Sequence, residues 1–522
     1  MDFSARTALI ADQFPEMRPI WETDRLRSPQ DGMSGDEVYR LAWLAVMYGD
    51  LALAETVLQA LFDAPKTRGL AAFSFAILAI AREKADLALS WAERCVELTF
   101  EPGNRRDSYM AQLAAMREHG DVRNIVGIFY DKYRSEFLLY LLLSKPLPSE
   151  VQSYCFAFSR CNRLILNMRD PVAFVDAEIG VNGHCLWTSI LLGHHRWLTV
   201  DYLRSDAYYD LARTISRSQH LLPFHVDCGV LTWIPRDTAK AFLLNPGAVP
   251  PRPGFVENFE LHHRPDLESA RGEIVLVTGC DERYLKFLQR VVASLLDIAG
   301  QHPTRRFHLH THVTNCSARS ASVLSLLHQA ILDLAPNLHL TFSTSGPDIQ
   351  ERAYYTFVRY LCAEKLQAEF DIHPLILDID CELNDHFVAA LDQLGKFDIG
   401  LRMFNFDKVT RRQFAGEPWS IGAHPTYCRN TPNGRALIRL IGDFVRTAYD
   451  PALETNWCID QCAIARAFDL ISTADSNLQV LNFAETIPFY HLPEEFGSKE
   501  EYAAELMTSL NPELQQLFQV LG

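Results

Sequence analysis

The stretch HPLILDIDCEL, residues 373–383, brings two carboxylates to the end of an apolar run. Leu375 to Leu377 predict a buried strand, and Asp378 and Asp380 follow it directly. A charge buried beside apolar side chains costs several kcal/mol unless an opposite charge compensates it. The pair therefore needs a positive partner, either a metal ion or an arginine, unless it lies in water at the end of the strand.

The segments around this stretch alternate between strand and helix patterns from about residue 272 onward. The strand patterns occupy residues 273–279, 305–313, 337–343, 374–380 and 397–403. The helical patterns occupy residues 281–300, 318–335 and 354–367. Strands separated by helices of this length predict βαβ units and a mostly parallel sheet. We therefore expect a C-terminal α/β domain over residues 269–522.

The two carboxylates fall where such a sheet binds ligands. In an open α/β sheet, ligands lie outside the carboxyl ends of the strands. Residues i and i+2 of an extended segment point to the same side, so Asp378 and Asp380 can face one cation. Oxygen-only ligands favour Mg²⁺ or Mn²⁺, which also bind substrate phosphates. The pair alone is equally compatible with a solvated strand end.

Four stretches of this half resemble the GT-A nucleotide-sugar glycosyltransferases, and among them the family 8 branch of glycogenin and lipopolysaccharide galactosyltransferase-like enzymes. They are VTGCDERYLKFLQRVVASL (277–295), YYTFVRYLCAEKL (354–366), LILDIDCEL (375–383) and NWCIDQCAI (456–464). The resemblance covers residues 273–498. It implies a GT-A fold, with Asp378 and Asp380 as the metal-binding motif.

The resemblance also implies roles for residues outside the metal motif. Asp281 and Tyr284 would contact the base and ribose of a nucleotide sugar, and Arg359 would lie near its diphosphate and sugar. Asp460 and Gln461 would lie near the sugar and the acceptor, where carboxylate and amide groups suit sugar hydroxyls.

Later segments carry weaker matches to the same family. In FYHLPEEFGSK (489–499), His491 is the expected third metal ligand and Lys499 the expected phosphate contact. The spacing from this His to the following Gly is longer than the family pattern. In WSIGAHPTYCRNTPNG (419–434), Gly422 and His424 would line the sugar pocket or shape a loop.

These features predict a metal-dependent glycosyltransferase, a hexosyltransferase-like enzyme, that uses a nucleotide sugar, with UDP as the expected nucleotide. Family likeness implies retention of anomeric configuration. One alternative is a phosphatase of the haloacid-dehalogenase type that uses Asp378 and Asp380. That family has Thr or Val two places after the second Asp, where this chain has Glu382. The other alternative is a non-catalytic helical scaffold that carries a degenerate transferase domain.

The N-terminal part, residues 1–145, shows helical hairpins with a weak repeat. Gly49 and Asp50 separate two apolar-periodic helices, with Ala54 at their crossing, and Ala88 is its equivalent 34 residues later. This period resembles the tetratricopeptide repeat. Such arrays form concave surfaces that hold peptides or partner proteins, which suggests that this part presents a protein or glycan acceptor. A plain helical packing module, or self-association into a homo-oligomer, is the competing interpretation.

Residues 146–268 are expected to form a middle α+β region of unknown role. Short β-like runs, AFVDAEIG (173–180), RWLTVDYL (196–203) and GVLTWI (229–234), alternate there with helical stretches. The proline-rich NPGAVPPRPGF (245–255) predicts a linker before the α/β domain.

Composition limits the classes of partner. The formal net charge of −16 argues against nucleic acid and against an anionic membrane surface, since both would repel the chain. The densest apolar run, FLLYLLL (137–143), is far shorter than the ~20 residues of a membrane span. The 12 cysteines form no CxxC pair, which predicts reduced thiols and a cytoplasmic protein. His308, His310 and His312 share one strand face, which we interpret as structural.

Overall fold

The computed structural model describes residues 50–81, 84–119, 184–219, 227–245, 259–345, 352–453, 455–491 and 510–521, with isolated positions between 41 and 45, 122 and 129, and 172 and 179. The chain divides into two compact units, Met1–Val230 and Leu231–Gly522.

The secondary-structure elements that the structure describes in the first unit are all helices. Its helices are α4 (Leu51–Asp63), α5 (Arg68–Ala81), α6 (Ala85–Thr99), α7 (Asn104–His119), α12 (Leu186–Leu198) and α13 (Tyr202–Gln219). Asp50 caps α4 by accepting a hydrogen bond of 3.0 Å from the Leu53 N–H. Ala54 and Ala88 are fully buried, as expected for small residues at helix crossings. The predicted helical N-terminal region is thus confirmed, while most of the third predicted hairpin lies outside the described residues.

Two of the β-like runs of the middle region do not form strands. Among the described residues 184–219 and 227–245, RWLTVDYL runs from the end of α12 into α13, whereas the strand β1 (Glu260–His262) lies near the end of the region. GVLTWI begins with the short helix α14 (Gly229–Thr232). Short apolar runs cannot be assigned to strand or helix by periodicity alone. α12 begins with a capping box formed by Cys185 and Thr188.

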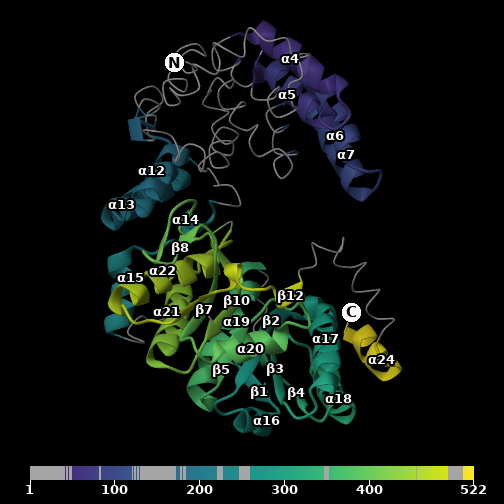
Figure 1. The fold of residues 1–522 in the computed structure, drawn as a ribbon, viewed down its shortest axis with the longest axis vertical. Helices are drawn as coiled ribbons and strands as arrows, with labels where there is room; N and C mark the ends of the chain where they lie inside the picture. Colours follow the sequence, from purple (N-terminus) through teal and green to yellow (C-terminus); the bar gives the residue numbers. More distant parts are fainter. Residues whose placement is uncertain are drawn as a thin grey trace. The chain divides into compact units, whose positions relative to one another are not determined.

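An eight-stranded sheet organises the second unit (Figure 1). Its order is β1-β4-β3-β2-β5-β10-β7-β11. The strands are β1 (Glu260–His262), β2 (Ile274–Asp281), β3 (Phe307–Thr314), β4 (Leu338–Ser345), β5 (His373–Ile376), β7 (Ile399–Met403), β10 (Ile421–Cys428) and β11 (Val480–Asn482). β2 to β5 are parallel to one another, while β1 and β10 run antiparallel to their neighbours. The predicted mostly parallel sheet is confirmed.

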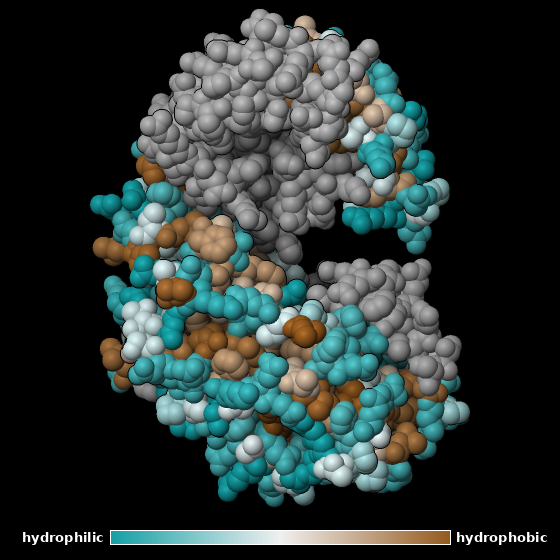
Figure 2. Space-filling model, viewed as in Figure 1, coloured by the Kyte–Doolittle hydropathy of each residue, from teal (hydrophilic) through white to brown (hydrophobic). Residues whose placement is uncertain are grey.

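Helices cover this sheet and complete its core. α17 (Leu288–Gln301), α18 (Ala318–Leu334), α20 (Phe387–Leu394) and α24 (Pro512–Leu521) share one buried apolar cluster with the strands. α19 (Arg352–Phe370), α21 (Pro432–Ala448) and α22 (Ile459–Ala474) pack against one another, and α19 also packs on β2. α15 (Arg236–Leu244) packs on α21 and α22. Figure 2 shows that the visible face of this unit is mostly hydrophilic, as expected for outward helix faces.

The histidines of β3 are structural, as interpreted from the sequence. His310 lies 2.9 Å from both Thr341 Oγ1 and Ser343 Oγ of β4 through its two ring nitrogens. His312 lies 2.8 Å from Ser343 Oγ and 2.9 Å from Ser345 Oγ. Burial lowers the pKa of each ring to about 3, so both are neutral in the folded protein near neutral pH. They form a hydrogen-bonded ladder between two parallel strands.

No helix among the described residues is long and apolar enough to cross a membrane.

Candidate functional site

The topology of the sheet creates a crevice between β2 and β5. From β2 the chain moves outward to β3 and β4, then returns to β5 on the other side of β2. This reversal is a topological switch point, where open α/β sheets bind ligands at the carboxyl ends of their strands. A cavity of about 270 Å³ lies there. It is lined by Gly279, Cys280, Asp281, Tyr284, Tyr355, Thr356, Arg359, Asp378, Ile379, Asp380 and Trp457.

Asp378 has two basic partners within the protein. The Arg359 Nη1 donates to its Oδ1, and the Nε2 of His424 lies 3.0 Å from its Oδ2. The Asp378 side chain is 33% exposed, whereas both partners are buried. The positive partner that the sequence predicts for Asp378 is therefore Arg359, and His424 is a second side chain in contact with the same carboxylate.

Arg359 reaches this position because α19 approaches β2 closely at a glycine. A Cβ on Gly279 would lie 3.0 Å from the Arg359 Cβ and 3.2 Å from its backbone nitrogen. Any larger residue would push α19 away from the sheet. The Arg359 Nη2 lies 3.7 Å from Oδ2 of Asp460, so one buried guanidinium faces two carboxylates.

Asp460 lies in the first turn of α22 and is almost completely buried. Burial raises its pKa, and the Arg359 guanidinium opposes this shift. Its Oδ1 accepts a hydrogen bond of 2.9 Å from the Gln461 N–H. The Gln461 side chain donates to the Ile421 carbonyl at 2.9 Å, so it fastens α22 to β10. Gln461 is not among the described residues that line the cavity.

Asp380 is 7% exposed and lines the same cavity as Asp378. Its backbone carbonyl accepts a long hydrogen bond of 3.4 Å from the buried Arg290 of α17. Sequence reasoning missed Arg290. A signal was present, because this arginine falls among the apolar positions of an amphipathic helix.

The segment 419–434 contributes one residue to the site. His424 contacts Asp378, and its ring centroid lies 5.2 Å from that of Tyr490. Gly422 lies in β10 opposite Arg402 of β7 and is not among the described residues that line the cavity. His424 thus contacts Asp378, whereas Gly422 lies beside the His424 backbone.

Asp281 and Tyr284 lie at the end of β2. Asp281 caps the 3-10 helix η3 (Glu282–Phe287), accepting from the Tyr284 N–H at 3.2 Å. Its Oδ2 also lies 2.7 Å from the Arg283 Nε. The Tyr284 side chain is 43% exposed and available to a ligand. The sequence did not predict the lining residues Tyr355, Thr356 and Trp457, although all three lie within the motifs that predicted their neighbours.

Strand pairing brings His491, the expected third metal ligand, beside the segment that follows the acidic pair. β12 (Tyr490–His491) pairs antiparallel with β6 (Glu382–Leu383), which places His491 opposite Glu382. The Nε2 of His491 lies 3.4 Å from the Asn384 Nδ2. Among the described residues, two groups of three or more His, Cys, Asp or Glu have their ligand atoms within 4.8 Å of one another, and neither contains Asp378, Asp380 or His491. Lys499 lies outside the described residues.

The two carboxylates nevertheless suit one kind of metal site. An ionised carboxylate offers about four lone-pair positions, and Arg359 and His424 use two of those on Asp378. Asp380 adds a second carboxylate to the same cavity. Mg²⁺ is commonly held by one or two carboxylates, waters and substrate phosphates. The donor set fits Mg²⁺ or Mn²⁺ bound together with a phosphate ligand, rather than an ion enclosed by protein alone.

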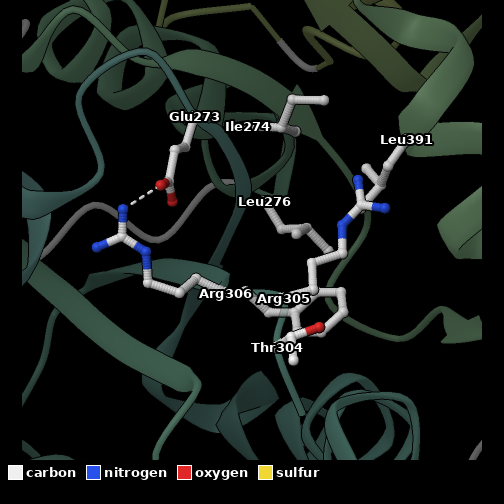
Figure 3. A pocket seen from close by; sticks show the side chains of 8 residues that line it. Glu273, Ile274, Leu276, Thr304, Arg305, Arg306 and Leu391 are labelled. Atoms are coloured by element: carbon white, nitrogen blue, oxygen red, sulfur yellow. Dashed lines mark hydrogen bonds and ion pairs between the residues drawn. The ribbon is translucent and has the colours of Figure 1, made fainter. Parts of the chain in front are cut away.

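A second cavity, of about 320 Å³, lies near the amino ends of β2 and β3 (Figure 3). Its two arginines are paired with acids: Arg306 with Glu273, as drawn, and Arg305 with Asp392 at 2.7 Å. This edge of the sheet is opposite the one that binds ligands in open α/β folds. We assign this cavity no role.

Comparison of the chain with protein-family models, with curated proteins and with solved structures finds no match. The fold and the geometry of the site define an α/β protein whose switch-point cavity is lined by both acidic and basic side chains.

Proposed function

We propose that this chain is a metal-dependent glycosyltransferase that moves a sugar from a nucleotide sugar, with UDP as the expected nucleotide, to a protein or glycan acceptor. The observation that carries the proposal is the position of Asp378 and Asp380 in a cavity at the carboxyl ends of β2 and β5. The four stretches that resemble GT-A family 8 enzymes provide Asp281, Arg359 and Asp460 around the same place.

The residues of the cavity suit the charges of such a donor. Bound Mg²⁺ or Mn²⁺ would supply neutralisation of the negative charge that develops on the diphosphate when the sugar leaves. Arg359 adds a fixed, buried cation beside the acidic pair, which costs no reorganisation during the reaction. Tyr284 and Trp457 offer aromatic surfaces to the base or sugar. Asp460, held by Arg359 and its own helix, positions that cation toward Asp378.

In this proposal the helical first unit binds the acceptor. An array of hairpins with buried small residues at 54 and 88 is suited to hold a peptide or an extended glycan. We propose further that these hairpins are tetratricopeptide repeats and that sugar transfer retains the anomeric configuration.

The test is calorimetric titration of the full chain with UDP-glucose, UDP-galactose and UDP-N-acetylglucosamine, each with and without Mn²⁺. We expect Mn²⁺-dependent binding of at least one donor, and a loss of at least about tenfold in affinity for Asp380→Asn. Asp385→Asn is the matched control, because Asp385 is exposed in the same segment and should bind as the unchanged chain does. Binding that is absent for all donors, or unchanged by Asp380→Asn, would contradict the proposal.

One observation favours a second candidate, the non-catalytic scaffold. Asp378 is already paired with Arg359 and His424, as a purely structural carboxylate would be. In that case Asp378→Asn should lower the free energy of unfolding and leave donor and metal binding unchanged. A transferase should instead lose Mn²⁺-dependent donor binding. Turnover of p-nitrophenyl phosphate in place of donor binding would indicate the phosphatase.

A further inference from the structure

A group of three metal-ligating side chains lies at the β1 edge of the sheet, outside the switch-point cavity. It consists of His263, Asp266 and His328, whose ligand atoms all lie within 4.8 Å of one another. His263 follows β1, Asp266 lies in α16 (Arg264–Ser269), and His328 lies in α18. β1, α16 and α18 all pack on β4, and Figure 1 labels these elements together at the foot of the view.

The side chains of the group do not hydrogen-bond to one another. The Nε2 of His328 lies 3.8 Å from the Asp266 Oδ2, beyond hydrogen-bond distance. The rings of His263 and His328 are stacked, with centroids 3.7 Å apart and planes at 17°. Zinc bonds of about 2.0–2.2 Å place tetrahedral ligand atoms about 3.4 Å apart, so shifts on the order of 1 Å would bring the three ligand atoms to that spacing. A metal binds a ring nitrogen in the plane of the ring, so the His263 ring would also have to rotate out of its stacked position for both rings to face one ion.

Hydrogen bonds with two neighbouring residues, Leu340 and His339, orient the ligand side chains. The Nδ1 of His328 lies 2.5 Å from the Leu340 carbonyl oxygen, which only accepts, so Nδ1 carries a proton and Nε2 is the nitrogen that faces Asp266. His339 donates from Nδ1 to the Asp266 Oδ1 at 2.9 Å, leaving Oδ2 toward His328. Outer hydrogen bonds of this kind fix the tautomer and orientation of metal ligands in zinc proteins.

His263 adds two further observations. Its backbone has a φ of 58°, a left-handed conformation that is uncommon for residues other than glycine. Among the side-chain atoms that the structure describes as buried, its Nε2 has no hydrogen-bond partner.

We propose that His263, Asp266 and His328 bind a Zn²⁺ ion, with water as the fourth ligand. Two imidazoles and one carboxylate are a donor set that zinc accepts in tetrahedral sites. The ion would link the segment of β1 and α16 to α18. It would thereby stabilise the position of the edge strand β1 beside β4. The site is separate from the acidic pair and holds whether or not the chain is a glycosyltransferase.

The test is titration of the metal-stripped full chain with Zn²⁺ against a chromophoric chelator. We expect a site of about 1:1 stoichiometry that His263→Gln and Asp266→Asn each weaken by roughly 10–100-fold or more. His262→Gln is the matched control, since His262 is adjacent but outside the group and should leave this site intact. Asp378→Asn with Asp380→Asn should also leave it intact, because those residues belong to the other site.

Absorption of bound Co²⁺ gives a second measurement, which reports the coordination of the metal and not the stability of the fold. Co²⁺ bound at the site should show the intense visible absorption of tetrahedral coordination, and this should be lost in His263→Gln. His263 is half-buried at a helix start, so this variant should fold, as circular dichroism can verify. Zinc affinity and cobalt spectra that are unchanged in both His263→Gln and Asp266→Asn would overturn the proposal, as would the absence of a stoichiometric site in the unchanged chain.

Discussion

A single buried arginine organises the candidate site at the scale of the residue. Arg359 faces Asp378 and Asp460 from one position, and the ring of His424 contacts the other oxygen of Asp378. Removal of one partner from a buried ion pair leaves an uncompensated charge, which is why such residues are hard to substitute. The same arrangement explains how a carboxylate as buried as Asp460 is tolerated next to the cavity.

Arg359→Leu should therefore lower the free energy of unfolding by about 3–5 kcal/mol. The change leaves Asp460 buried without its cation, because Asp460 is only 5% exposed. Chemical denaturation followed by tryptophan fluorescence measures the effect. Arg271→Leu is the control, since Arg271 and its partner Asp371 are both exposed, at 73% and 53%, and a change below about 1 kcal/mol is expected. Equal effects in the two variants would refute this view of Arg359.

At the scale of the element, strands were predictable where they were buried on both faces. The run IVLVTG of β2 and the run PLILD around β5 are continuous and apolar, as parallel strands between helix layers must be. RWLTVDYL and GVLTWI, two β-like runs of the middle region, lie in helices and the residues next to them, because runs this short cannot be assigned to strand or helix by periodicity alone. The pairing of β12 with β6 was not predictable, because it joins two-residue strands about a hundred residues apart.

The ladder between β3 and β4 predicts a specific pH dependence. His310 and His312 have a pKa of about 3 when folded and about 6.5 when unfolded. The unfolded chain therefore binds more protons below pH 6.5. Stability should be complete above that pH and should fall as the pH drops toward 3, by about 1 kcal/mol per pH unit for each ring.

The double variant His310→Gln with His312→Gln isolates this contribution. Its melting temperature at neutral pH should be lower, because the hydrogen-bonded ladder changes, but it should depend less on pH between 6.5 and 4 than that of the unchanged chain. Differential scanning fluorimetry across this range gives both slopes, and carboxylate titration is common to the two proteins. Parallel curves would show that the two rings do not titrate with folding.

At the scale of the whole molecule, residues 231–245 belong to the second unit. The Nε of the buried Arg466 donates to the Ile234 carbonyl at 3.1 Å, and its guanidinium lies 4.4 Å from the Trp233 ring centroid. Arg236 pairs with Asp469 at 2.8 Å. A boundary at residue 269, suggested by the proline-rich segment, would separate these partners.

Two fragments test this division. Leu231–Gly522 should be soluble, should unfold cooperatively, and should bind a nucleotide sugar within about threefold of the full chain if the proposed function holds. The fragment 269–522 should be less stable, because Arg466 and Asp469 lose buried partners. Solubility and thermal melting compare the two, and a fragment 269–522 as stable as the longer one would place the boundary where the sequence suggested.

The sequence by itself determined the alternation of buried strands and helices, the helical character of the first unit, and the acidic pair at a strand end. These follow from local periodicity, which a continuous stretch of chain encodes. Only the tertiary structure decided which cation meets Asp378, where His491 lies, and which histidines gather at the β1 edge of the sheet. Those contacts join residues far apart in the chain, and their distances depend on how closely helices such as α19 can approach the sheet.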